Sequence, residues 1–467
     1  MLLVAGVVTA GGCAQLPDLG TAPTLKPVEQ LENARSLAAC ETAWPGDRWW
    51  ESYGDSQLTA LVEEALHDSP DLERAQARLR HAGAAVQSAG AALMPEVTGT
   101  ASVTQEKQSY HYLMPRTAVP QDWNDYGRAT VNLSWELDFW GKNRSGLAAA
   151  TSERQAAEAE VAQARLILST SVASMYAELV HLFSVRDSAE AALTIRTKTV
   201  DLFRERHQFG LENLASVRQV EGKRAAAQAE LLTVDERIAL QKNGIAALLG
   251  AGPDRGMAIT RPTASFTGTD GLPANLAFEL LGRRPDITAA RMRTEGAAQR
   301  IDQQKAGFYP SVNLLAFAGL QSLGINNLTR SGADIGSFGP AISLPIFNTE
   351  RLQGQLRGAR AEYDAAVAGY HGTLTNALRE VADAVTSRKA LDGELAASRS
   401  AVDAARESHG IVSSRYQGGL ATYLDVLIAE DARISAERFL ADIETRALVL
   451  DVALVRALGG GFQATNQ

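Results

Sequence analysis

The sequence has few aromatic residues, 6% of the chain, whereas glycine, with 39 residues, and alanine are abundant. This composition favours closely packed helices over a core of bulky rings. Positive charge is in the minority, with 45 Lys and Arg against 54 Asp and Glu, which argues against a nucleic-acid-binding protein. No run of 18 or more apolar residues occurs, so a transmembrane helix is not expected, and a membrane role would require a lipid anchor or a β-barrel. A hydrophobic fraction of 45% excludes global disorder.

Motifs of catalysis are also missing. The chain has no phosphate-binding loop, no Gly-x-Ser-x-Gly nucleophile elbow and no His-Glu-x-x-His zinc motif. Its seven histidines are spread along the sequence without the spacing of metal ligands. We therefore expect neither an enzyme nor a cofactor or metal site.

The N-terminus carries the pattern of an export signal. A short apolar run, Leu2–Ala10, leads through Gly11 and Gly12 to Cys13, and it is too short to span a bilayer. This arrangement resembles the bacterial lipoprotein box, which implies a signal peptide over residues 1–12 and a lipid, palmitate among its acyl chains, attached at Cys13. Two alternatives remain open: a cleaved signal with Cys13 as an ordinary residue, or a Cys13–Cys40 disulfide formed in an oxidising compartment.

The chain contains a tandem duplication. Ser69–Leu72 recurs as Arg284–Ile287, and Arg206–Leu211 lines up with Arg415–Leu420. Between the two halves, residues 251–274 are rich in proline and glycine, which interrupt regular structure. The expected organisation is therefore an anchored N-terminal segment (13–50), a first repeat (51–250), an inter-repeat segment (251–274), a second repeat (275–460) and a tail (461–467).

Each repeat contains a very long helix followed by a returning helix. Residues 147–209 lack proline and glycine and consist of good helix formers, which predicts a rod of roughly 95 Å. Gly210 ends this helix, and a second helix runs back toward Gly250. The second repeat has the same order of helices over residues 351–416 and 420–458 and no proline, although scattered glycines such as Gly354 and Gly372 weaken the first of these helices. The helical hairpins are thus expected at about residues 145–250 and 349–458.

A different pattern precedes each long helix. Apolar and polar residues alternate over 97–104 and 128–137, and less cleanly over 311–320 and 335–344. Alternation with a period of two predicts strands that have one apolar and one polar face. Each repeat should therefore supply one β-hairpin, at about 96–139 and 311–346, which gives four strands per chain.

Two features favour strands that cross a membrane over a small sheet packed on a soluble core. Aromatic residues gather at both ends of the first hairpin: Tyr110, Tyr112, Trp123 and Tyr126 at the loop, and Trp135, Phe139 and Trp140 at the other end. The distance from Tyr126 to Phe139 corresponds to roughly 33 Å of height in a tilted strand, which matches a barrel with aromatic girdles. The polar face also carries Arg128 and Glu136, which suit a water-filled lumen.

Four strands cannot close a barrel, and an open sheet in lipid would leave two unpaired edges. Eight strands enclose an interior that side chains fill. A conduit therefore requires three or more copies of the chain.

The residues that carry a family resemblance are spread over nearly the whole chain. They are Trp49–Asp55, Pro70 and Asp71, Trp135–Gly141, Arg283–Ile287, Tyr416–Leu420 and Asp425–Leu427. Together they resemble the outer membrane factor (TolC-like) family, and most closely the lipoprotein, NodT-type subgroup of resistance-nodulation-division efflux systems. The resemblance implies a mainly α fold with a membrane β part, in which long helical hairpins form an α-barrel. It also implies a homotrimer with a 12-stranded β-barrel and an equatorial collar.

The resemblance further places a periplasmic gate at the helix turns near Gly210 and Gly419. Its pattern contains a Tyr, an Arg and two Asp, of which Tyr416 and Asp425 match, while Ala421 and Ile428 stand at the other two positions. We expect Asp425 to share a helix face with small and apolar residues: Ala421, Ile428, Ala429 and Ala432. A symmetric ring of such carboxylates would favour cations. The alternative is a solvated surface carboxylate. Ser216 is the counterpart of Asp425 in the first repeat.

The function expected from the resemblance is a passive outer membrane channel of a tripartite efflux system for drugs or other toxic compounds. Its partners would be a periplasmic adaptor protein and an inner-membrane transporter, which supplies the energy, and the protein would sit lipid-anchored in the outer membrane and extend into the periplasm. Two alternatives are a channel for type I secretion of proteins or toxins, and a periplasmic coiled-coil scaffold without a pore. The exported substrate is not readable from the sequence.

Overall fold

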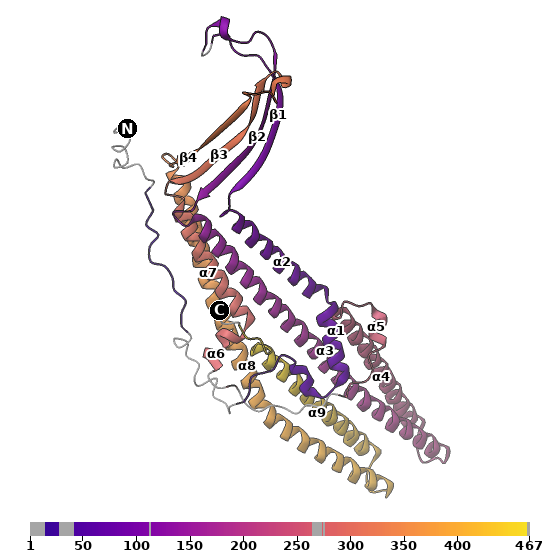
Figure 1. Ribbon diagram of the computed structural model, residues 1–467. Coiled ribbons are helices and arrows are strands. Elements are labelled where there is room, and N and C mark those ends of the chain that lie inside the picture. Colours follow the sequence, from indigo (N-terminus) through magenta and orange to yellow (C-terminus); the bar gives the residue numbers. More distant parts are fainter. Residues whose placement is uncertain (1–14, 28–41, 112–113, 264–272, 274–275, 465–467) are drawn as a thin grey trace. The chain divides into compact units, whose positions relative to one another are not determined.

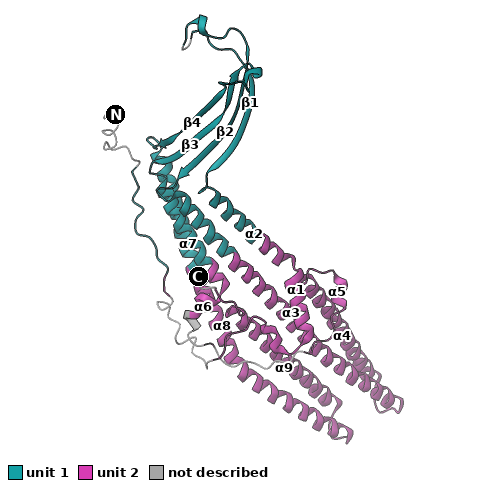
Figure 2. Cartoon of the chain, viewed as in Figure 1, with its two compact units in different colours: residues 1–25, 78–157, 290–370 teal, residues 26–77, 158–289, 371–467 magenta. Residues whose placement is uncertain are grey.

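The computed structural model describes residues 15–27, 42–111, 114–263, 273 and 276–464. Cys13, Cys40 and Tyr112 lie outside these residues. The chain forms two compact units (Figure 2), and each takes segments from both repeats. Unit 1 comprises residues 1–25, 78–157 and 290–370, and unit 2 comprises residues 26–77, 158–289 and 371–467. A repeat is therefore a unit of sequence, but it is not a compact unit of the fold.

Unit 1 contains a curved antiparallel sheet (Figure 1). Its strands are β1 (Glu96–Glu106), β2 (Asn124–Leu137), β3 (Ser311–Leu323) and β4 (Asp334–Ser343), in the spatial order β1-β2-β3-β4. Both hairpins lie where the alternating pattern predicted strands. The inner strands β2 and β3 pair with each other, so one sheet joins the hairpins of the two repeats.

The register of the sheet separates its faces. One face is apolar and includes Val97, Val103, Ala129, Val131, Leu133, Leu314, Ala316, Phe338 and Ile342. The other includes Thr98, Thr100, Ser102, Arg128, Thr130, Asn132, Asn313, Gln321 and Ser337. Tyr126 lies on this polar face, in register with Thr104, so the expectation that it belongs to a lipid-facing girdle is wrong. The reason is parity, because residues an even number apart in a strand share a face.

Helices make up most of the described chain, and the predicted fold class, mainly α with a four-stranded sheet, is confirmed. The helices are α1 (Ser56–Asp68), α2 (Pro70–Ala91), α3 (Lys142–Gln208), α4 (Leu214–Leu248), α5 (Pro253–Met257), α6 (Leu276–Arg283), α7 (Pro285–Ala306), α8 (Thr349–Gln417) and α9 (Tyr423–Ala457). The repeated Pro-Asp motif begins α2 and α7, because proline suits the first turn of a helix, where its missing N–H leaves no hydrogen bond unmade.

Helix α3 contains one stretch of 18 residues that is apolar enough to cross a membrane by length and composition. More than half of that stretch is buried inside the protein, as in a core helix of a soluble domain. The stretch is therefore weak support for a membrane-spanning helix.

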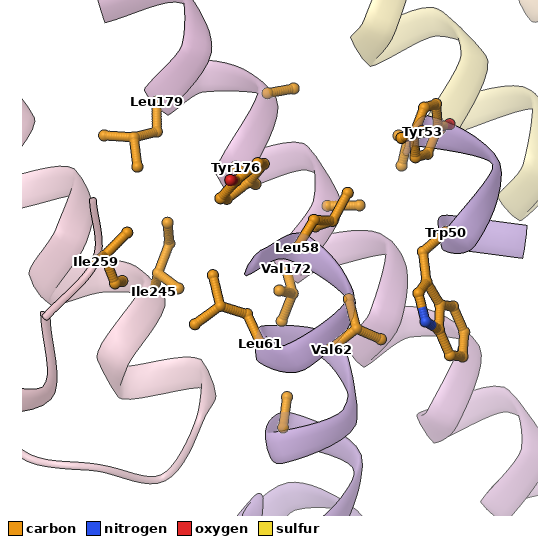
Figure 3. Close-up of a cluster of buried hydrophobic side chains, with 14 of the residues drawn as sticks. Trp50, Tyr53, Leu58, Leu61, Val62, Val172, Tyr176, Leu179, Ile245 and Ile259 are labelled. Atoms are coloured by element: carbon orange, nitrogen blue, oxygen red, sulfur yellow. The ribbon is translucent and has the colours of Figure 1, made fainter. Parts of the chain in front are cut away.

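The main core of unit 2 brings together segments that are far apart in the sequence (Figure 3). Leu61 of α1, Tyr176 of α3 and Ile245 of α4 are almost fully buried against one another. Trp50, which precedes α1, and Val452 of α9 belong to the same cluster. The hydrophobic cluster thus ties the start of the first repeat to the end of the second.

A buried arginine joins three helices in the same unit. Arg284, at the start of α7, makes a bidentate ion pair with Asp286, with N–O distances of 3.0 and 2.6 Å. Its Nη1 also donates to Glu380 of α8 at 2.8 Å and to the carbonyl oxygen of Ala457 of α9 at 2.9 Å. The planar fork of arginine allows these bonds to form at once, which the ammonium group of lysine could not reproduce.

Asp55 is a second buried polar anchor of unit 2, with 3% of its surface exposed. Its Oδ1 accepts hydrogen bonds from the backbone N–H groups of Gln57 and Leu58 at 2.8 and 3.2 Å, which caps the N-terminus of α1. Its Oδ2 accepts from the Tyr176 hydroxyl and from the Thr263 N–H, both at 2.8 Å. One carboxylate therefore connects α1, α3 and the segment between the repeats.

We predict that Asp55→Ala lowers the free energy of unfolding by about 2–4 kcal/mol, because a helix cap is lost and buried donors are left without a partner. Asp71→Ala is the matched control, since Asp71 is an exposed residue at the start of α2 that pairs with no described residue other than Arg74, a surface contact worth about 0–1 kcal/mol. Denaturation followed by circular dichroism in detergent measures both variants. An equal decrease in the free energy of unfolding in the two variants would contradict the role assigned to Asp55.

Candidate functional site at the helix tips

The two helical hairpins of unit 2 turn through the same backbone motif. Gly210 follows α3 with φ +71°, and Gly419 follows α8 with φ +73°, a left-handed conformation that favours glycine. After each glycine, the N–H of the next residue donates to a carbonyl five residues back, Leu211 to Arg206 at 2.9 Å and Leu420 to Arg415 at 2.8 Å. The repeat alignment of the two turns is therefore also a structural equivalence.

The helices that leave these turns are capped at equivalent positions. The Asn213 side chain accepts from the Ser216 N–H at 2.8 Å at the start of α4. Thr422 caps α9 in the same way and forms a capping box with Asp425. Ser216 and Asp425 thus occupy the same helical position. Since α9 begins at Tyr423, Ala421 precedes the helix, and the expectation that it shares a helix face with Asp425 is wrong.

Asp425 is exposed, and its carboxylate serves the cap. Its Oδ2 accepts from the Thr422 hydroxyl at 2.6 Å and from the Thr422 N–H at 2.8 Å. These hydrogen bonds hold the pKa of Asp425 below its usual value. One turn later, Ile428 is 60% exposed where the family pattern has a second carboxylate. The tip therefore presents one firmly ionised carboxylate beside apolar surface.

Tyr416 lies in an aromatic cluster that contacts α3. The ring of Tyr423 is 4.1 Å from the ring of Phe203 and 5.8 Å from that of Tyr416. The guanidinium of Arg206 lies 5.6 Å from the centre of the Tyr416 ring, as in a cation–π contact. Burial raises the pKa of both tyrosines, so both stay neutral at physiological pH. No hydrogen bond joins Tyr416 to Asp425 among the described residues.

A group of ionic side chains, here called the ionic cluster and made of Arg196, Lys223, Glu430 and Asp431, lies farther along the same helices. Arg196 of α3 donates to Asp431 of α9 at 2.9 Å, and Lys223 of α4 reaches the other oxygen of Asp431 at 3.4 Å. Arg196 Nε also lies 3.6 Å from Oε1 of Glu430. The ionic cluster thus links the first helical hairpin to α9.

Glu430 is the unusual member of the ionic cluster. Only 2% of its surface is exposed, and its Oε1 is buried without a hydrogen bond to any described residue. Burial raises the pKa of Glu430, and the positive charge of Arg196 opposes that shift only in part. Sequence reasoning missed this residue, although one signal was available: Glu430 lies three residues after Leu427 and four before Ile434, on the apolar face of α9.

We predict that Glu430→Gln changes the pH dependence of stability. Burial disfavours the ionised form of Glu430 in the folded protein, so the pKa of this residue is higher there than in the unfolded chain. As the pH rises through the range between these two pKa values, Glu430 therefore lowers the stability of the folded protein. The melting temperature of the variant relative to the native protein should therefore increase between about pH 4.5 and pH 7.5.

Glu444→Gln is the matched control, because Glu444 lies on the same helix, is about half exposed and faces Arg399 at 3.7 Å. The difference in melting temperature between Glu444→Gln and the native protein should change little over the same pH range. If the melting temperature of Glu430→Gln differed from that of the native protein by the same amount at every pH, burial would not be what sets the pKa of Glu430.

Comparison with known proteins identifies the family. The model of the family described as "Outer membrane efflux protein" matches residues 61–251 and 276–460. The chain is 30% identical over 461 residues to the multidrug resistance outer membrane protein MdtP of Escherichia coli K12, covering 97% of this chain and 94% of MdtP. It is 32% identical to the fusaric acid resistance protein FusA of Burkholderia cepacia, covering 75% of this chain and 67% of FusA.

Among solved structures, the outer membrane protein VceC of Vibrio cholerae has a TM-score of 0.85 to this chain and 48% sequence identity, over 90% of this chain and all of VceC. The family match covers most of both repeats, and the fold of VceC extends over nearly the whole chain. The chain belongs to the outer membrane efflux protein family and is the outer membrane channel component of an efflux system.

Proposed function

We propose that this channel is a homotrimer that exports small toxic compounds passively through the outer membrane. The observation that carries the proposal is the sheet of unit 1, which has one apolar face, one polar face and two outer edges. At these edges, the outer sides of β1 and β4 pair with no strand among the described residues.

Those edges cannot be left open in lipid. β1 has 11 residues and β4 has 10, and each edge presents unpaired backbone N–H and C=O groups along its length. Each such group costs several kcal/mol in hydrocarbon, where no water can satisfy it. Three copies joined edge to edge give a closed ring of 12 strands, with the polar face around the lumen.

Exposed apolar side chains support the orientation of this sheet. Val131, Phe338 and Ile342 on the apolar face are 56%, 76% and 70% exposed in the single chain. Near the end of β2, Phe139 and Trp140 are 63% and 52% exposed, as expected of aromatic residues at a membrane interface. Lipid would cover these side chains, whereas water would leave them unfavourably exposed.

Lipid attachment at Cys13 is part of the proposal. The segment that follows it lies along α8: Gln353 donates to the carbonyl oxygen of Gln15 at 2.9 Å, and Arg360 donates to that of Thr21 at 2.6 Å. Gln353 belongs to the first turns of α8, shortly after β4 ends at Ser343. The described residues that follow Cys13 thus contact the part of α8 next to the sheet, which supports a lipid anchor in the inner leaflet.

The names of the relatives favour efflux of small compounds over protein secretion, since MdtP is a multidrug resistance protein and FusA a fusaric acid resistance protein. We infer that an inner-membrane transporter supplies the energy and that a periplasmic adaptor contacts the helix tips. Leu211 and Leu420 at those tips are 64% and 73% exposed, which leaves apolar surface for a partner.

We further propose that the tips form the gate, with Asp425 as the charged group and Tyr416 in the aromatic cluster beside it. Ala421 and Ile428 supply neither the arginine nor the second aspartate of the family pattern. The pair formed by Arg196 and Asp431 has the required chemistry and joins the two helical hairpins. We propose that this ion pair replaces the missing arginine and second aspartate in holding the gate closed.

The central test is whether the purified protein forms a channel. In detergent it should behave as a trimer by light scattering, and in planar bilayers it should give discrete conductance steps, because a closed 12-stranded ring encloses water. A monodisperse monomer that stays soluble without detergent and conducts no current would end the proposal.

The role of Asp425 can be tested separately from its role as a cap. Asp425→Asn removes the charge but keeps an oxygen that can accept from Thr422, so we predict a lower preference for cations and only a small decrease in the melting temperature. Thr422→Ala removes the cap but keeps the charge, so it should lower stability and leave ion selectivity unchanged. Reversal potentials in a salt gradient measure selectivity. Native selectivity in Asp425→Asn would remove this carboxylate from the gate.

A further inference from the structure

The polar face of the sheet also carries a few large apolar side chains, Leu315, Phe317 and Ile335, and the aromatic one is Phe317. Phe317 of β3 is in register with Asn132 of β2 and Ser337 of β4, so its side chain shares the face of threonine, serine and asparagine residues. It is only partly buried. A large ring on a face that would line a water-filled lumen makes no contact with lipid.

The nearest cation on this face is directed at that ring. The guanidinium carbon of Arg128 lies 5.5 Å from the centre of the Phe317 ring, within the range of a cation–π contact. Arg128 makes no hydrogen bond or ion pair with any described residue. A guanidinium that contacts an aromatic ring keeps N–H donors free for a carboxylate, which binds such a fork in a bidentate manner.

We propose that Arg128 and Phe317 form a binding site for aromatic carboxylates on the lumen wall of the channel. This inference rests on the proposed function, because the polar face lines a lumen only in the closed ring. The carboxylate would pair with the guanidinium of Arg128, and the ligand's ring would stack beside Phe317. Thr130 and Asn132, on the same face, provide a polar surround.

The site combines the two contacts that such a ligand needs and that water alone cannot supply. A simple inorganic anion would use only Arg128, and a neutral aromatic compound only Phe317. A trimer would carry three such sites. Binding should be weak, with a dissociation constant on the order of millimolar, because a conduit has to release what it binds.

The test is a titration of the detergent-solubilised protein with benzoate, followed by ligand-observed saturation-transfer NMR. We expect saturable binding of benzoate and much weaker binding of acetate, which lacks the ring. Phe317→Ser and Arg128→Gln should each weaken benzoate binding about three- to tenfold.

Two matched controls are available. Phe338→Ser removes an exposed phenylalanine of the neighbouring strand on the opposite face, and Arg330→Gln removes an exposed arginine from the turn between β3 and β4. Both variants should bind benzoate as the native protein does. Benzoate binding that is insensitive to Phe317→Ser and Arg128→Gln, or equally sensitive to the two controls, would overturn the inference.

Conductance of the same preparation separates the two proposals. Clear conductance steps without site-dependent benzoate binding would overturn the lumen site and leave the channel intact. Absence of conductance would overturn the channel, and with it the placing of Arg128 and Phe317 in a lumen.

Discussion

Backbone hydrogen bonding at the edges of one sheet is the constraint on which the rest of this protein depends. Four strands pair side by side, and the outer strands β1 and β4 have no partner among the described residues. In water such edges are tolerable, but in hydrocarbon each unpaired group costs several kcal/mol. When the edges pair with those of other copies of the chain, that cost is removed and the amphipathic sheets form the wall of a closed barrel. The polar side of the sheet then lines a lumen filled with water.

Unit 2 shows how burial and hydrogen bonding compete over carboxylates. Asp55 and Glu430 are both almost fully buried, yet their pKa values shift in opposite directions. Burial raises the pKa of Asp55, but hydrogen bonds from Tyr176, Thr263 and the start of α1 outweigh it, and the pKa is lowered. Among the described residues, Glu430 has no comparable donors, and burial dominates its pKa. The charge of Asp55 is therefore well compensated in the folded protein, whereas that of Glu430 is compensated only in part.

Local signals predicted much of the fold. The strands and long helices lie close to where alternation, the absence of proline and the abundance of helix-forming residues placed them, because these signals act over neighbouring residues. Both hairpin turns occur at the glycines that the repeat singled out, since a left-handed residue is required there. The same alignment paired Ser216 with Asp425, and both occupy the third position of their helices. The start of α9 was misjudged because Thr422 caps the helix, which leaves Ala421 outside it.

The sequence by itself therefore determined the duplicated architecture, the two faces of each strand and the turns at the helix tips, because period and turn chemistry are properties of consecutive residues. Only the tertiary structure decided which side chains meet. Arg196 contacts Asp431, and Arg128 lies against Phe317, across separations in sequence that periodicity does not bridge. A pattern tells which face a residue occupies, but its partner depends on the packing of a distant segment, and the chemistry of a site depends on that partner.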